Sequence, residues 1–153
     1  MLRPISLFSG VLAGGLLFRA AFSTSAIRSD TGNRVFYRIR YTQEFDQLKA
    51  LPTPLLCNFY IRNDPFSKTV SERLKEIVEK ETFNTVNAVD VEADEPEVRD
   101  LMTDYGVNQI PTIIALRGGI VIDKYVPKKN TDLGDLKSWV DRIGGGDAPK
   151  KEE

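Results

Sequence analysis

Hydrophobic and polar positions along the chain predict strands and helices in alternation. Apolar runs of strand length occupy residues 35–41, 55–61, 85–91, 112–116 and 120–125. Amphipathic stretches with helical spacing occur around Phe45 and Leu48, at residues 66–78 and 96–105, and after Thr131. This order predicts one α/β domain over residues 34–143.

Cap residues mark several of the predicted boundaries. Asp64 is a favoured N-cap residue and Pro65 fits a first helical turn, so a helix is predicted to begin there. Gly106 is expected to end the preceding helix in the left-handed conformation. The last helix is expected to have Thr131 as N-cap and to bury Leu133, Leu136, Val140 and Ile143. Residues 144–153 are expected to form a disordered tail.

The first 28 residues differ in composition from the rest of the chain. Their only charged residues are Arg3, Arg19 and Arg28, and the first acidic residue is Asp30. This asymmetry predicts a mitochondrial presequence over residues 1–28; the alternative is a secretory signal with residues 5–18 as its apolar core. The apolar stretch is shorter than the roughly 20 residues that cross a bilayer. We therefore expect no permanent membrane span.

Charge and cysteine content exclude several function classes. The chain has 21 basic and 22 acidic residues and no histidine. It lacks the one-signed basic face that nucleic-acid binding needs, so no nucleic-acid partner is expected. The single cysteine, Cys57, cannot form an internal disulfide, and its place in a predicted central strand indicates a buried, unreactive thiol.

Acidic residues gather at the predicted end of the third strand: Asp90, Glu92, Asp94, Glu95 and Glu97. Such a cluster raises the question of a calcium site, but Glu95 stands where a calcium loop needs glycine. We interpret the cluster as a solvated strand end and helix start. No metal and no cofactor are expected.

Three short segments resemble the thioredoxin family. Leu-Cys-Asn-Phe-Tyr at 56–60 resembles its central strand, Asp-Tyr-Gly-Val at 104–107 the end of its following helix, and Ile-Pro-Thr at 110–112 its cis-proline loop. The resemblance covers about Val35 to Ile143. It implies a thioredoxin fold, with a central mixed β-sheet flanked by helices on both faces, and a cis peptide bond before Pro111.

The chain departs from this family at the redox motif. The family has Trp-Cys-Gly-Pro-Cys-Lys where residues 63–68 read Asn-Asp-Pro-Phe-Ser-Lys. Asp64 and Ser67 thus replace both cysteines, and Asn58 stands at the place of the family's buried aspartate. Dithiol exchange needs a low-pKa thiolate and a second, resolving thiol. The resemblance therefore implies a redox-inactive member, with no catalytic residues and no enzymatic activity.

A thioredoxin fold without thiols keeps the groove between the helix start and the cis-proline loop. Extended peptides can pair with backbone groups there by strand addition. The groove residues are expected to be Asp64, Pro65, Phe66, Ser67, Ile110, Pro111 and Thr112. Phe66 is expected either at the groove edge or in the core, and Trp139 either in the core or at a contact surface.

The sequence thus predicts a non-catalytic protein-binding or assembly module of the mitochondrial matrix, such as a subunit or assembly helper of a larger complex. One alternative is a glutathione-linked thiol enzyme that uses Ser67. Another is a redox-silent relative of protein disulfide isomerase in the endoplasmic reticulum lumen.

Overall fold

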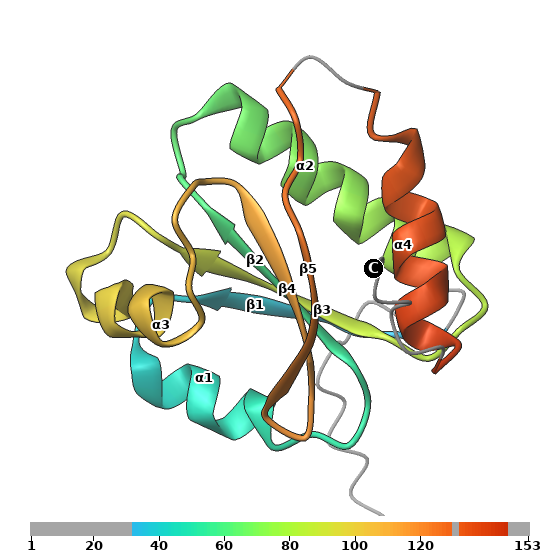
Figure 1. The fold of residues 1–153 in the computed structure, drawn as a ribbon, viewed down its shortest axis with the longest axis horizontal. Helices are drawn as coiled ribbons and strands as arrows, with labels where there is room; N and C mark the ends of the chain where they lie inside the picture. Colours follow the sequence, from blue (N-terminus) through green and yellow to red (C-terminus); the bar gives the residue numbers. More distant parts are fainter. Residues whose placement is uncertain (1–31, 130–131, 147–153) are drawn as a thin grey trace, which may run out of the picture.

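A five-stranded mixed sheet forms the centre of the molecule (Figure 1). The computed structural model describes residues 32–129 and 132–146. The strands are β1 (Val35–Ile39), β2 (Leu55–Tyr60), β3 (Asn87–Glu92), β4 (Thr112–Arg117) and β5 (Ile120–Tyr125), in the spatial order β1-β3-β2-β4-β5. β1, β3 and β2 run parallel, and β4 and β5 continue the sheet in antiparallel pairs. The predicted α/β class with a mixed sheet is confirmed.

Helices cover both faces of this sheet (Figure 1). One face carries α2 (Pro65–Glu76), its π-helical continuation η1 (Ile77–Glu81) and α4 (Gly134–Gly144). The other face carries α1 (Thr42–Lys49), the 3-10 turn η2 (Pro96–Val98) and α3 (Arg99–Asp104). Within the described part of the chain, no helix is both long enough and apolar enough to cross a membrane.

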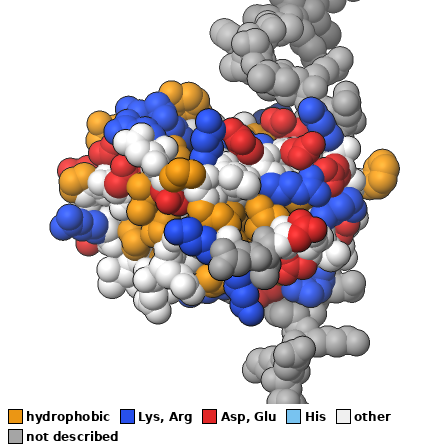
Figure 2. Space-filling view, turned by 90° about the horizontal axis from the view of Figure 1, so that it is seen from above, with side chains coloured by type: hydrophobic (Ala, Val, Ile, Leu, Met, Phe, Trp, Pro, Cys, Tyr) orange, Lys and Arg blue, Asp and Glu red, His pale blue; other side chains and the backbone are white. Residues whose placement is uncertain are grey.

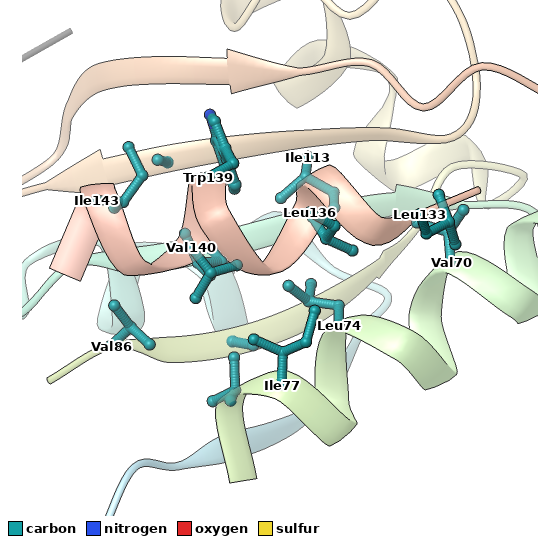
Figure 3. Packing of buried hydrophobic residues seen from close by; sticks show 14 residues of the cluster. Val70, Leu74, Ile77, Val86, Ile113, Leu133, Leu136, Trp139, Val140 and Ile143 are labelled. Atoms are coloured by element: carbon teal, nitrogen blue, oxygen red, sulfur yellow. The ribbon is translucent and has the colours of Figure 1, made fainter. Parts of the chain in front are cut away.

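Each helix layer has its own hydrophobic core. Figure 3 shows the core under α2 and α4, where Leu136 and Val140 of α4 face Leu74 and Ile77. Trp139 is only 4% exposed, and its indole N–H donates to Asp123 at 2.9 Å. Trp139 is therefore a core residue rather than a contact residue, and the four predicted inward positions of the last helix are all buried.

Several predicted boundaries were wrong by a few residues, and local hydrogen bonds explain two of them. β1 ends at Ile39 because the Arg40 and Tyr41 N–H groups donate to the Glu44 carboxylate, which turns the chain into α1. α4 begins at Gly134 with Leu133 at the N-cap, since its first hydrogen bond runs from the Leu136 N–H to the Leu133 C=O.

Some predictions fall on parts of the chain that the structure does not describe. The predicted N-cap Thr131, the presequence at 1–28 and most of the predicted tail lie outside the described residues. Gly144, the first residue assigned to that tail, is the last residue of α4.

Candidate functional site

Strand pairing brings the two predicted groove segments together at the end of the sheet where β2 finishes and β4 begins. β2 runs into the loop that begins α2, and β4 starts directly after Pro111. β2 and β4 are antiparallel, with Phe59 opposite Thr112. The end of β2 and the start of β4 are therefore neighbours, and so are the helix start at 64–67 and the loop at 110–112.

Asp64 and Ser67 occupy the helix start and are hydrogen-bonded to the local backbone. The Asp64 carboxylate accepts the Ser67 N–H at 2.7 Å, which makes Asp64 the N-cap of α2, as predicted. The backbone hydrogen bond from Ser67 lowers the pKa of Asp64 below its usual value. The Ser67 hydroxyl is fully buried and accepts the Ile61 N–H at 3.3 Å. Both side chains stabilise this helix start.

Pro65 and Phe66 form the first turn of α2. Pro65 is exposed, whereas Phe66 is half-buried and packs against the core shared by α2 and α4. Phe66 thus combines the two expectations for it, because one part of the ring contacts the core and the rest is accessible.

The loop before β4 supplies the opposite side of the site. The Ile110–Pro111 peptide bond is cis, as the resemblance implied. Pro111 and Thr112 are buried, and the Thr112 hydroxyl donates to the Gln109 C=O at 2.6 Å. Ile110 is half-buried and packs against the core under α1 and α3. Ile110 is therefore the accessible side chain of this loop segment.

Cys57 lies in the middle of β2 with no exposed surface. Burial away from water strongly raises the pKa of its thiol. Because the thiolate is the reactive form of cysteine, Cys57 has the properties of a small core side chain.

A buried carboxylate, Asp90, lies next to Asn58 on the sheet face covered by α2. The two residues are paired across β2 and β3, and the Asn58 amide donates to the Asp90 carboxylate at 3.0 Å. From α2, Ser71 donates to Asp90 at 2.6 Å and Lys75 forms an ion pair with it at 2.6 Å. A buried acid is therefore present directly beside Asn58, on the neighbouring strand β3.

Glu92 lies two residues after Asp90 in β3, on the same face of the sheet, and is also fully buried. Its carboxylate accepts the Tyr60 hydroxyl at 3.1 Å and forms an ion pair with Arg38 at 3.1 Å. The Arg40 Nε lies 3.2 Å from the second carboxylate oxygen, but these two atoms are misaligned for a hydrogen bond. Burial is the main cause that raises the pKa of Tyr60 to about 12.

The expectation of a solvated acidic cluster was wrong for Asp90 and Glu92. Both lie within a strand buried on both faces, where their alternation with Val89 and Val91 points them to the α2 side. That alternation, matched by Asn58 and Tyr60 in β2, was the available sequence signal. Among the described residues, no group of three or more acidic, cysteine or histidine side chains is arranged to hold a metal ion.

Figure 2 shows the surface from above, with basic and acidic side chains intermingled around a group of apolar side chains. No one-signed charged area dominates this view.

Comparisons with known proteins relate the chain to thioredoxins. It is 30% identical over 101 residues to the mitochondrial thioredoxins of Bos taurus and Mus musculus. The match covers 65% of this chain and 57% of each relative, so it spans little more than half the length of these proteins. No model of a known protein family matches the chain.

Solved structures share the arrangement of strands and helices. The thioredoxin of Malassezia sympodialis superposes with a TM-score of 0.61 at 18% identity, over 72% of this chain and 93% of that one. A mutant thioredoxin from Halobacterium salinarum gives 0.57 at 21% identity, over 72% and 90% of the two chains. The chain therefore has the thioredoxin fold and is similar in sequence to mitochondrial thioredoxins.

Proposed function

We propose that this chain is a non-catalytic thioredoxin-fold module that binds protein partners in mitochondria, as a subunit or assembly helper of a larger complex. The observation that carries the proposal is the start of α2. Asp64 and Ser67 are hydrogen-bonded to each other there, in place of the two thiols that the redox motif requires.

The remaining sulfur does not replace the missing pair. Disulfide exchange proceeds through an accessible thiolate and a mixed disulfide that a second thiol resolves. Cys57 is the single cysteine of the chain, it is fully buried, and burial raises the pKa of its thiol. These properties support a role other than dithiol chemistry.

Binding requires only the shape and backbone groups that the fold retains. The helix start at 64–67 and the loop at 110–112 meet at one edge of the sheet, with Phe66 and Ile110 each half-buried. Partly exposed apolar side chains beside a loop backbone suit an extended peptide, which binds by backbone hydrogen bonds and side-chain contacts. We therefore place the partner-binding groove at Asp64, Pro65, Phe66, Ser67, Ile110, Pro111 and Thr112.

A mitochondrial location is supported by two independent features. The chain is similar to mitochondrial thioredoxins, and its first 28 residues have the composition of a presequence. We propose the matrix as the compartment. Imaging the full-length chain with a C-terminal tag tests this, and residence in the endoplasmic reticulum would support the alternative location.

The state of Ser67 argues against the glutathione-linked alternative. A serine that assists a bound thiol must present its hydroxyl to the ligand. Here the hydroxyl is fully buried and accepts the Ile61 N–H. Retention of the protein on a glutathione column would contradict this argument.

The absence of redox activity can be tested with an insulin-reduction assay on the wild type and on the double variant Asp64→Cys and Ser67→Cys. We expect no activity from the wild type, because the site has no thiol. A gain of activity in the double variant would show that the assay responds to a dithiol in this scaffold. Robust wild-type activity would refute the proposal.

Partner binding can be tested by affinity purification of the tagged protein from isolated mitochondria. Phe66→Ala removes an apolar contact at the groove, and Phe83→Ala is the matched control. Phe83 is fully exposed and precedes β3, at the opposite end of the parallel strands. We expect a defined complex that Phe66→Ala weakens and Phe83→Ala leaves intact, with circular dichroism showing that both variants remain folded at the assay temperature. The reverse pattern would exclude a role centred on this groove.

A further inference from the structure

A long hollow lies between the outer strand β1 and helix α2, on the sheet face that carries the buried acids. Its volume is about 1180 Å³, which exceeds the roughly 300–1,000 Å³ typical of small-molecule pockets. Residues 33–38 line one side, and α2 lines the other with Lys68, Ser71, Glu72 and Lys75. These α2 positions follow helical spacing, so one face of the helix borders the hollow along its length. This size and shape suit an extended chain better than a compact ligand.

The strand side of the hollow is an outer edge of the sheet. Among the residues that the structure describes, β1 is the outermost strand and pairs only with β3. The Arg34 C=O accepts the Ala88 N–H of β3 at 2.9 Å. Because backbone groups alternate in direction along a strand, the N–H and C=O groups of Val35 point to the open edge. The pairing of β1 with β3 is irregular between Phe36 and Ile39, the stretch that contains Tyr37. The five residues of β1 offer about 16 Å of edge, enough for roughly five residues of an added strand.

Side chains around this edge are aromatic and basic. Tyr37 is 81% exposed, and Val35 and Phe36 are half-buried. The hollow is lined by five basic residues (Arg34, Arg38, Arg62, Lys68 and Lys75) and three acidic ones (Glu72, Glu79 and Asp90). Three of the basic side chains form ion pairs: Arg38 with Glu92, Lys75 with Asp90 and Lys68 with Glu72. The positive charge open to a ligand is therefore mainly that of the exposed Arg34 and Arg62.

We propose that the β1 edge and the hollow beside it form a docking site for an extended acidic segment of a partner protein. The segment adds a strand to β1, its apolar side chains contact Tyr37, and its carboxylates face Arg34, Arg62 and Lys68, which are exposed. A second copy of this chain pairing through β1 would place the same basic side chains against each other, which disfavours self-association. The site is separate from the proposed groove and does not depend on it.

Fluorescence anisotropy with two labelled peptides tests the proposal. One peptide alternates Glu and Val over eight residues, and the other has Lys in place of Glu. We expect the Glu peptide to bind the full chain at least tenfold more tightly than the Lys peptide at about 0.15 M salt, with a loss of affinity as salt rises. The double variant Arg34→Glu and Lys68→Glu should weaken binding about tenfold. The matched control is Arg99→Glu, which changes an exposed arginine of α3 on the other sheet face.

Backbone NMR shifts locate the bound peptide. We expect the Glu peptide to shift the amide signals of Val35 and Tyr37, and Tyr37→Ala to weaken its binding. Equal affinity for both peptides would overturn the proposal. So would equal loss from Arg99→Glu, shifts confined to α3, or a concentration-dependent dimer that the double variant strengthens.

Discussion

Removal of the Asp90 carboxylate is the perturbation whose cost follows most directly from the structure. Asp90 is 5% exposed and accepts hydrogen bonds from Asn58 and Ser71, which are 0% and 5% exposed. Asp90→Ala leaves these two buried donors unpaired, and each costs about 1–3 kcal/mol. Lys75 also loses its ion pair, but its side chain is 40% exposed and regains water, so it adds little.

Part of this cost is offset, because the variant no longer has to transfer the Asp90 carboxylate from water into the protein interior when it folds. We expect Asp90→Ala to lower the free energy of unfolding by about 3 kcal/mol, within the range for disruption of a buried polar network. With a denaturant slope of about 2 kcal/mol/M, the urea midpoint falls by about 1.5 M. Asp90→Asn keeps one acceptor oxygen but cannot neutralise Lys75, so we expect a smaller loss of about 2 kcal/mol.

The measurement is urea unfolding followed by circular dichroism. Asp94→Ala is the matched control, because Asp94 is an exposed acid just after the same strand. We expect the control to change stability by less than about 0.5 kcal/mol. A loss below about 1 kcal/mol for Asp90→Ala, or equal losses for the two alanine variants, would refute the assignment of Asp90 to a buried network.

Three further results are expected from local features. Asp64→Ala should destabilise the protein at pH 7; the pKa of Asp64 is lowered in the folded state, so the difference from wild type should disappear in unfolding experiments as the pH falls from about 4 toward 2. The Cys57 thiol should fail to react with a thiol reagent at pH 8 until denaturant unfolds the protein, and rapid native-state labelling would contradict its burial. Trp139→Ala should cost about 4 kcal/mol in urea unfolding, and a loss under about 1 kcal/mol would exclude a core position.

Much of the fold could be predicted from local patterns. β2 was recognisable because Leu55, Leu56 and Phe59 make it nearly continuously apolar, and all six of its residues are buried. The start of α2 followed from Asp64 and Pro65, whose cap and first-turn roles depend only on neighbouring backbone groups. The missing thiols at positions 64 and 67 were also visible in the sequence, since they are a matter of residue identity.

The roles of Phe66 and Trp139 could not be decided in the same way. Both are large apolar residues on amphipathic helices, and their spacing does not fix how far each side chain reaches into the core. The structure buries Trp139 and leaves Phe66 half-buried, because Trp139 packs between α4 and the sheet while Phe66 lies in the first turn of α2.

The sequence by itself determined the order of strands and helices, the class of fold and the absence of cysteine at positions 64 and 67, because these depend on local spacing and residue type. Only the tertiary structure decided that Asp90 and Glu92 are buried. Their partners Ser71 and Arg38 come from α2 and from β1, which the sheet order brings beside β3. A charged residue at a strand end is solvated or buried according to what packs over it, and that neighbour is distant in the sequence.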